Sequence, residues 1–272
     1  GGLAGSLASI SIPSITNARV GPLEDIVRLS SNENPYGPSK KALMAASQAS
    51  SMGAYYPSKI TMQLKQAIAV KNNLNMNQVV LSSGSNEVLS AAVVAWGKEG
   101  KILSPDFTYD LHLRYAERIG AEIVRLPLTS DMSIDLDALE NAIDDSVSMV
   151  YVCNPNNPTG KTIDGNILRN FCLRVGKKIT VLIDEAYNEL TQNPEYSSMV
   201  DLVRDNQNII VTRTFSKLYG MAGMRVGYAL GRSDLINRVG NHVMAWPNIV
   251  GLAAAHALSL IHISEPTRLS AI

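Results

Sequence analysis

The sequence predicts an α/β protein built on a doubly wound, mostly parallel sheet in three layers. Short apolar runs rich in β-branched residues recur along the chain, and residues typical of turns follow them. Between several of these runs lie segments whose apolar residues have helical spacing. Strands that alternate with helices in this way form parallel sheets with helices on both faces. A length of 272 residues, 46% of them hydrophobic, is enough for one large domain and part of a second.

The expected elements follow in chain order. The polar segment at residues 30–39 contains two prolines and a glycine, so we expect an extended loop before the core. We predict seven strands from the β-branched runs, at residues 79–82, 101–104, 122–126, 149–152, 179–183, 209–212 and 226–230. Because apolar residues elsewhere recur every three or four positions, we predict helices at residues 86–96, 111–119, 136–142 and 167–175.

The two ends of the chain differ in composition from the rest. We expect residues 1–30 to be an N-terminal arm, whose apolar and uncharged start also suits the remnant of a signal peptide. The expected location is therefore cytoplasmic, with export to the periplasm as the alternative if residues 1–15 come from such a leader. Residues 258–272 interrupt an Ala-rich helical pattern, and we interpret them as a foreign tail that cuts short a small domain beginning at residues 246–257.

Charge and cysteine content disfavour several classes of protein. The 24 basic and 24 acidic residues cancel and no long basic block occurs, so nucleic acid is not an expected partner. No run of 18 apolar residues is present, so no membrane span is expected. Two cysteines and four scattered histidines are too few for a disulfide framework or a metal cluster, so we expect no metal.

Ligands of open parallel sheets bind beyond the carboxyl ends of the strands, and four predicted strands end in chemically unusual residues. After the first comes Ser83-Gly84-Ser85-Asn86, which suits a phosphate at a helix N-terminus, although a Ser or Asn cap would give the same pattern. After the fourth, residues 154–160 contain two Asn-Pro turns. Rigidly held amides of this kind suit a ligand oxygen.

The fifth and sixth strands end in charged residues. Asp184 ends a buried run, which is costly unless the carboxylate meets a cation or a donor, but it could also cap a helix that opens at Glu185. After the sixth strand come Thr214, Ser216 and Lys217, and Arg225 follows eight residues later. Taken alone, the lysine could be a solvated surface residue and the arginine an ordinary ion-pair partner.

Together these motifs resemble fold-type I, pyridoxal-phosphate-dependent aminotransferases of class I and II. The resemblance lies in the order and spacing of residues 157–160, of Asp184-Glu185-Ala186-Tyr187, and of Thr214-Phe215-Ser216-Lys217 with Arg225. Residues 31–38, the pair Tyr56-Pro57 and residues 153–160 are most similar to histidinol-phosphate aminotransferases. The resemblance covers roughly residues 28–257. It implies that residues 31–245 form the cofactor-binding large domain, with an N-terminal segment that closes over the substrate.

The resemblance implies pyridoxal 5'-phosphate as the cofactor and gives residues their roles. Lys217 would attach to the cofactor through a Schiff base and then move a proton. Asp184 would keep the pyridine nitrogen protonated, and Asn157 and Tyr187 would donate to the phenolic oxygen. The cofactor's phosphate would be bound by a set of small, hydroxyl and cationic residues, namely Ser83, Gly84, Ser85, Asn86, Thr214, Ser216 and Arg225.

Aromatic residues receive the remaining roles. Phe107 resembles the ring stacked on the pyridine, with Tyr109 as its rival because the local alignment is ambiguous. Tyr56 resembles the tyrosine that reaches the phosphate from a second subunit, which implies a homodimer. Tyr36 and Asn157 are the expected substrate contacts. The family's arginine for the substrate α-carboxylate has no match, since Arg268 lies in the tail.

The expected reaction moves an amino group between an amino acid, or an amino-acid-like phosphate of the histidinol-phosphate type, and a 2-oxo acid. Two alternatives stay open. The same lysine could serve a decarboxylase or a lyase, or the chain could be a catalytically inert fragment that binds the cofactor. A nucleotide-binding domain is a weaker interpretation because no G-x-G-x-x-G follows the first strand.

Overall fold

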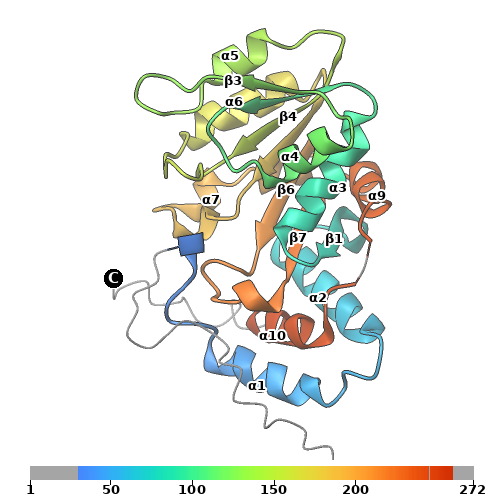
Figure 1. The fold of residues 1–272 in the computed structure, drawn as a ribbon. Helices are drawn as coiled ribbons and strands as arrows, with labels where there is room; N and C mark the ends of the chain where they lie inside the picture. Colours follow the sequence, from blue (N-terminus) through green and yellow to red (C-terminus); the bar gives the residue numbers. More distant parts are fainter. Residues whose placement is uncertain (1–29, 245, 260–272) are drawn as a thin grey trace, which may run out of the picture. The chain divides into compact units, whose positions relative to one another are not determined.

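A seven-stranded sheet organises the computed structural model, which describes residues 30–244 and 246–259 (Figure 1). Residues 33–259 of this description belong to one unit, and the 3-10 helix η1 (Ser30–Asn32) belongs to a separate N-terminal unit. Most of the expected N-terminal arm and all but the first two residues of the expected foreign tail lie outside the described residues. Leu258 and Ser259, which we had assigned to that tail, still belong to a helix.

Six of the seven strands in the described chain run in one direction. Their order in the sheet is β1-β7-β6-β5-β4-β2-β3, and β7 is antiparallel to both of its neighbours. Every expected strand is present, at β1 (Val79–Ser82), β2 (Lys101–Pro105), β3 (Ile123–Leu126), β4 (Val147–Cys153), β5 (Thr180–Asp184), β6 (Ile209–Thr214) and β7 (Gly227–Gly231). The predicted fold class, an α/β protein with a mostly parallel sheet, is therefore confirmed.

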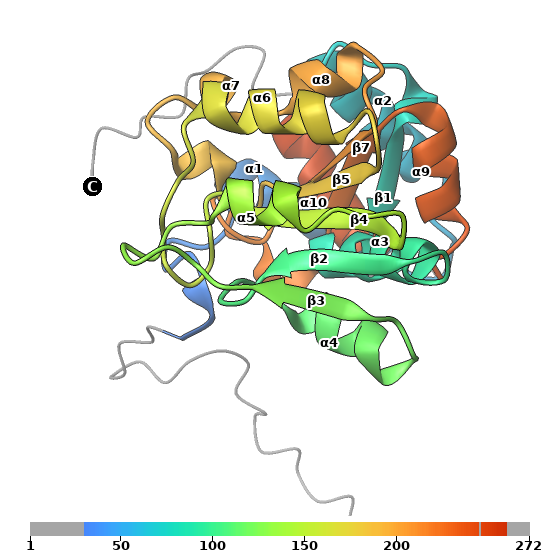
Figure 2. The same ribbon diagram turned by 90° about the horizontal axis from the view of Figure 1, so that it is seen from above.

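Helices cover both faces of the sheet (Figure 2). One face carries α3 (Ser85–Gly97), α4 (Leu111–Arg118) and α9 (Ser233–Gly240). The other carries α1 (Lys40–Ser50), α2 (Ser58–Lys71), α5 (Leu136–Asn141), α6 (Gly165–Val175), α8 (Val200–Arg204) and α10 (Ile249–Ser259). Shorter elements connect them, namely η2 (Met76–Gln78), η3 (Asn188–Leu190), α7 (Pro194–Ser197) and η4 (Ala222–Met224). The four helices expected from periodicity correspond to α3, α4, α5 and α6.

Local sequence explains where several helices begin. Ser39 caps α1 through its hydroxyl, and Asp135 and Asp164 cap α5 and α6 through their carboxylates. Such side chains satisfy backbone N–H groups that have no partner within the helix. Helix α3 begins differently, because the residue before it is Gly84 and no side chain caps it.

Alternating side chains along the strands form two separate cores. On β5, Val181 and Ile183 pack with the α1/α2 side, whereas Leu182 packs with the α3/α4 side. Because side chains alternate along a strand, Asp184 belongs to the same face as Leu182. The carboxylate therefore lies on the side of the sheet that α3 and α4 cover.

Crossing a bilayer requires a helix that is both long and apolar. Each helix within residues 30–244 and 246–259 lacks at least one of these two properties.

Candidate active site

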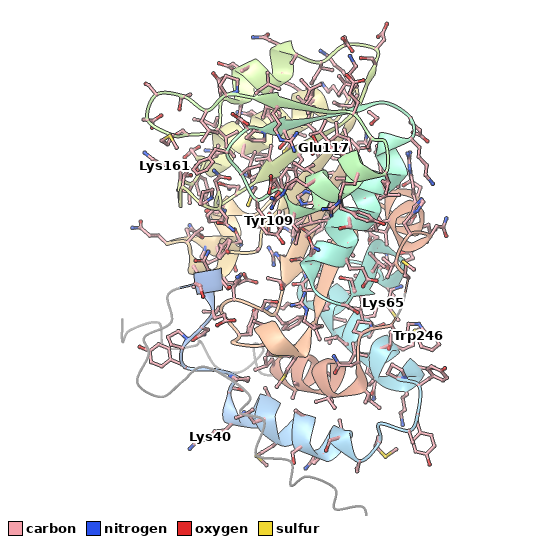
Figure 3. The ribbon with its side chains drawn as sticks, viewed as in Figure 1. Lys40, Lys65, Tyr109, Glu117, Lys161 and Trp246 are labelled. Carbon is pink, nitrogen blue, oxygen red and sulfur yellow. The ribbon has the colours of Figure 1, made fainter. Side chains whose placement is uncertain are left out.

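The chemically unusual residues of the sequence lie at one edge of the sheet. The carboxyl ends of β4, β5 and β6 are in register there, with Cys153 beside Asp184 and Asp184 beside Thr212. The carboxyl end of β1 and the start of β7 join them, because Gly227 pairs with both Ser82 and Thr214. Segments far apart in the sequence thereby place their side chains in one region, around the position of Tyr109 in Figure 3.

Asp184 is a buried carboxylate at this edge, with only 2% of its surface exposed. The Thr212 hydroxyl donates to its Oδ1 over 2.9 Å. Burial raises the pKa of Asp184 to about 6, while the Thr212 hydroxyl, the Ala186 N–H and the charge of Lys217 act in the opposite direction. No α-helix opens at Glu185, since the next element is η3, so the alternative role of helix cap is wrong. The carboxylate is held ready for a cation or a strong donor.

Lys217 is partly buried close to Asp184 and Tyr187. Its Nζ lies 5.5 Å from the centroid of the Tyr187 ring. Burial lowers the pKa of the Lys217 amine, while the charges of Glu33 and Asp184 raise it and that of Arg225 lowers it. A lysine that loses its proton more readily is a better nucleophile at neutral pH. The interpretation of Lys217 as a solvated surface residue therefore does not hold.

The start of α3 forms a cradle of backbone groups. Gly84 has a φ of +88°, and a Cβ built on it would overlap the Arg225 guanidinium. A Cβ on Gly227 would likewise run into the backbone of Gly84 and Ser85. The expected alternative, a Ser or Asn cap on this helix, is wrong because no side chain caps α3. Backbone N–H groups at an uncapped helix start suit an anion.

Arg225 brings a cation to this cradle from the β6–β7 connection. It has a left-handed φ of 52°, and its Nη2 donates to the Ser83 carbonyl over 3.2 Å. Its Nη1 donates to the Ala222 carbonyl over 2.8 Å and to the Ser216 hydroxyl over 3.4 Å. The Thr214 hydroxyl in turn donates to Ser216 over 2.8 Å. Hydroxyls and a guanidinium thus converge beside the helix start.

The structure separates the two aromatic candidates. The Phe107 side chain is 52% exposed, whereas Tyr109 is half-buried and its hydroxyl donates to Asn86 Oδ1 over 3.3 Å. Burial raises the pKa of Tyr109 to about 12, with further contributions from Asp184 and Tyr187. These neighbours place Tyr109 inside the cluster. The geometry favours Tyr109 over Phe107 as the ring that faces a ligand.

The three asparagines of the Asn-Pro turns have different roles. Asn156 fixes the loop after β2, because it accepts from the Thr108 hydroxyl over 2.7 Å and donates to the Phe107 carbonyl over 3.1 Å. Asn154 accepts from the Ile163 N–H over 2.9 Å. Within the described part of the chain the Asn157 side chain makes no such hydrogen bond. The Asn157 amide is therefore available to a ligand, and the buried Nδ2 of Asn154 also has no hydrogen-bond partner among the described residues.

Two predicted residues lie outside the cluster. Tyr36 is 78% exposed and Tyr56 is 85% exposed. The Tyr56 ring meets the edge of Trp246 at a centroid distance of 5.5 Å. Tyr56 and Trp246 line a hollow of about 930 Å³ between the start of α2 and the segment before α10. The structure thus does not bring these two tyrosines to the other predicted residues.

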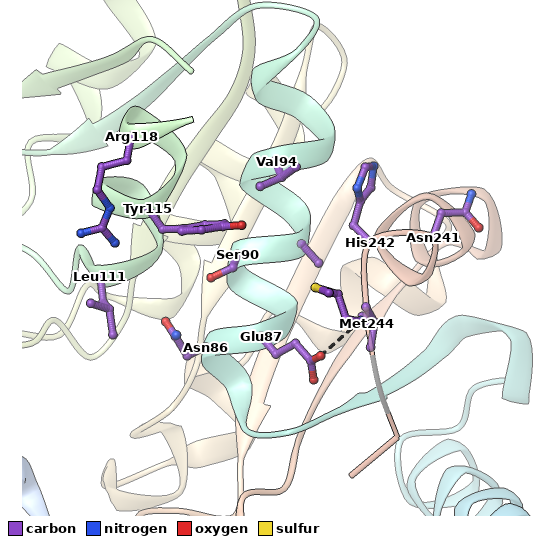
Figure 4. Close-up of a pocket in the computed structure, with 12 residues that line it drawn as sticks. Asn86, Glu87, Ser90, Val94, Leu111, Tyr115, Arg118, Asn241, His242 and Met244 are labelled. Carbon is purple, nitrogen blue, oxygen red and sulfur yellow. Dashed lines mark hydrogen bonds between the residues drawn. The ribbon is translucent and has the colours of Figure 1, made fainter. Parts of the chain in front are cut away.

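A cavity of about 610 Å³ lies next to the start of α3 (Figure 4). Side chains of α3, α4 and the segment after α9 line it, and Asn86 stands between it and Tyr109. Glu87 anchors this wall, because its carboxylate accepts the Ser83 N–H over 2.6 Å and the Met244 N–H over 3.3 Å. Glu87 therefore connects the start of α3 to the turn before it and to the segment after α9.

Comparison with known proteins places this arrangement in a family. Residues 24–263 match the family described as aminotransferase class I and II. The chain belongs to this family. A histidinol-phosphate aminotransferase of Lysinibacillus sphaericus is 34% identical over 80% of this chain and 59% of its own length, and an aromatic amino acid aminotransferase of Corynebacterium glutamicum is 34% identical over 79% and 63%. This aminotransferase chain thus spans about three fifths of those relatives.

A solved structure supports the same assignment. The histidinol-phosphate aminotransferase of Sinorhizobium meliloti, crystallised with pyridoxal-5'-phosphate, aligns with a TM-score of 0.76 and 25% identity. The alignment covers 86% of this aminotransferase chain and 64% of the other. The expected resemblance to class I and II aminotransferases is confirmed.

Sequence reasoning missed one pair of charged residues in this aminotransferase chain. Glu185 is fully buried and accepts from Arg213 Nε and Nη2 over 3.0 and 2.8 Å. Glu185 also accepts the Met199 N–H, so the pair ties the turn after β5 to β6 and to the start of α8. The arginine inside the buried strand β6 was the available signal, because a buried guanidinium requires a carboxylate.

Proposed function

We propose that this chain carries the cofactor-binding part of a pyridoxal-phosphate-dependent transaminase. The reaction would move an amino group between an amino acid, or an amino-acid-like phosphate of the histidinol-phosphate type, and a 2-oxo acid. The proposal rests on one observation, the convergence of Lys217, Asp184 and the Arg225 cradle at a single sheet edge. The names of the Lysinibacillus and Corynebacterium relatives support the reaction class. They indicate two kinds of amino donor, of the histidinol-phosphate type and of the aromatic amino acid type.

The residues present fit pyridoxal phosphate. The uncapped start of α3, into which a Cβ on Gly84 would intrude, suits the phosphate, with Arg225, Thr214 and Ser216 beside it. Buried Asp184, whose pKa is raised to about 6 without a full counter-charge, suits a pyridinium N–H. When bound, the cofactor supplies an electron sink for the negative charge that develops at the substrate Cα.

Each residue of the site would then have its own role in the reaction. Asp184 would hold a proton on the pyridine nitrogen, and its burial strengthens that interaction because water is excluded. Lys217, with its lowered amine pKa, would bind the cofactor covalently and later carry the proton at the substrate Cα. Asn157 and Tyr187 would orient the ring through its phenolic oxygen, and Tyr109 would cover one of its faces.

The remaining roles belong to the same proposal. Tyr36 and Asn157 would contact the substrate, and exposed Tyr56 would reach the phosphate of a second copy in a homodimer. Residues 31–245 would be the large domain, with a smaller domain beginning at residues 246–257. The proposed location is cytoplasmic, with periplasmic export as the alternative, and fractionation of cells that express the complete gene would distinguish the two.

The first test is the site of covalent cofactor attachment. The folded chain is mixed with pyridoxal phosphate, reduced with borohydride, digested and analysed by mass spectrometry. We expect the label on Lys217 and its loss in Lys217→Ala. Lys71→Ala is the matched control, because burial also lowers the pKa of the Lys71 amine although Lys71 lies away from the site. A label that persists in Lys217→Ala, or that moves to Lys71, would overturn the proposal.

Product analysis separates the reaction classes. A separate sample of the chain, loaded with pyridoxal phosphate and not reduced, is incubated with L-histidinol phosphate or an aromatic L-amino acid together with 2-oxoglutarate. Glutamate formation supports a transaminase. Release of CO2 or ammonia supports a decarboxylase or a lyase on the same lysine. A chain that takes the label on Lys217 but forms no product supports the inert cofactor-binding fragment.

A further inference from the structure

We propose that His112 is a positioning residue that backs the Tyr109 ring from the side of α4, so that the opposite face of that ring meets the cofactor. His112 has no role in the site described above. The inference rests on the proposed function, because Tyr109 has a cofactor to face only if the site binds one.

The rings of three residues form a continuous row. His112 lies in the first turn of α4 and is fully buried. Its ring stacks on that of Tyr109 with centroids 5.9 Å apart and planes inclined by 26°. His112 also meets the ring of Tyr151 edge-on, at 4.5 Å and 72°. Both distances lie in the range in which aromatic rings attract one another.

Tyr151 connects this row to the strand beside Asp184. It lies on β4 on the same face as Cys153, and Cys153 is the register partner of Asp184. Strand β4 lies between β2 and β5 in the sheet, and Tyr151 pairs with Leu182 of β5, so Tyr151 provides a rigid support. His112 contacts both this support and Tyr109. The position of β4, the strand that flanks Asp184, thereby influences the orientation of the Tyr109 ring.

His112 acts here as a flat, neutral ring. Burial lowers the pKa of His112 to about 3, so the imidazole carries no charge at neutral pH. Within the described residues neither of its ring nitrogens has a hydrogen-bond partner. The contact with Tyr109 is therefore one of ring faces, and a phenylalanine at this position could reproduce it.

Tyr109 is held at three places, and His112 supplies one of them. The Tyr109 hydroxyl donates to Asn86, and the preceding residue Thr108 is tied to Asn156. These contacts fix the tip of the side chain and the backbone beside it, but they leave rotation of the ring about its long axis unrestrained. The stacked imidazole restrains that rotation, because turning the ring would lose the face-to-face contact.

The experiment compares His112→Leu, which removes the flat ring, with His112→Phe, which keeps it. Leu113→Val is the matched control, because Leu113 is equally buried on α4. Tyrosines are replaced by 3-fluorotyrosine, and the 19F resonance of Tyr109 is assigned with Tyr109→Phe. Each variant is then titrated with pyridoxal phosphate, and the visible circular dichroism of the bound cofactor is recorded.

We expect His112→Leu to shift and sharpen the Tyr109 resonance already without cofactor, to reduce the dichroism, and to weaken cofactor binding about three- to tenfold. His112→Phe should restore all three, and Leu113→Val should change none. An unchanged Tyr109 resonance in His112→Leu, or a His112→Phe variant as impaired as His112→Leu, overturns the inference in a chain that binds the cofactor. Failure of the unmodified chain to bind pyridoxal phosphate overturns the proposed function as well.

Discussion

Asp184 shows at the scale of one residue how the fold creates a functional group. The carboxylate ends a fully buried strand and receives a hydroxyl, a backbone N–H and the field of Lys217. These contacts only partly offset the loss of water, so its pKa rises. The ionised form of Asp184 is therefore destabilised in the folded chain without a cofactor, so the free energy of unfolding of the apoprotein depends on pH.

The destabilisation of ionised Asp184 can be measured as a pH-dependent change in the free energy of unfolding. Since the folded-state pKa of Asp184 is raised to about 6 from 3.8, its favourable contribution is complete below pH 3.8 and is lost as the pH rises through 6. Asp184→Asn removes this dependence. In urea unfolding of the cofactor-free chain, the variant should gain up to about 3 kcal/mol relative to the unmodified chain between pH 4 and pH 7.

Asp205→Asn is the control, because Asp205 is exposed at the end of α8. Because the position is exposed, the stability of Asp205→Asn should stay within about 0.5 kcal/mol of that of the unmodified chain in the same measurements. A constant difference for Asp184→Asn would show that Asp184 ionises in the folded chain as it does in the unfolded one.

Single residues also show what the sequence could predict. Asp184, Lys217 and Arg225 were expected in one site because each follows or precedes a strand whose end could be recognised. The choice between Phe107 and Tyr109 could not be made from sequence. Both are aromatic residues in one loop, and they are distinguished by burial and by tertiary contacts such as that of Tyr109 with Asn86. The roles of Glu185 and His112 depend on tertiary neighbours in the same way.

At the scale of elements, the turn after β4 holds the loop after β2. Asn156 carries this contact through one accepted and one donated hydrogen bond. Because Asn156 is buried and Thr108 nearly so, removing the amide leaves buried polar groups without partners. The turn thereby sets the position of the loop that bears Tyr109.

Asn156→Ala should destabilise the chain by about 1–3 kcal/mol in urea unfolding. It should also speed amide hydrogen exchange in residues 106–110, because the loop loses its attachment. Asn166→Ala, at an exposed position on α6, should change stability by less than about 0.5 kcal/mol. Equal effects of the two substitutions would show that the Asn156 contacts do not hold the loop.

Element type was more predictable than element direction. Apolar runs indicated all seven strands because a buried strand needs apolar side chains on both faces. The same run gives no sign of which way the strand points, so the antiparallel placement of β7 could not be inferred. Nor did the two Asn-Pro turns reveal that the Asn156 side chain holds the loop after β2.

At the scale of the whole molecule, apolar side chains gather around the hollow that Tyr56 lines, outside the cluster of the other proposed site residues. Tyr56, Trp246 and Met244 are 85%, 57% and 93% exposed around one hollow. Exposed apolar groups of this size are typical of association surfaces. They support the homodimer that the proposed role of Tyr56 requires.

The chain should therefore sediment at about twice its mass of 29.4 kDa. Tyr56→Glu should shift the equilibrium toward the single chain, because a charge would be buried in the interface. Glu195→Gln, on the exposed part of α7, is the control and should leave the mass unchanged. A single-chain mass at micromolar concentration would contradict the proposed dimer.

The antiparallel strand β7 also determines how the chain can be divided. It pairs with β1 on one side and β6 on the other, so Ser82 and Thr214 meet through Gly227. The cradle therefore joins residues near the start of the described chain to residues near its end. No contiguous piece shorter than residues 83–225 holds both halves of it. Two fragments separated by a cut between β3 and β4 could form the site only by reassembling, and the hydrogen bond from Arg225 to the Ser83 carbonyl would report that they had done so.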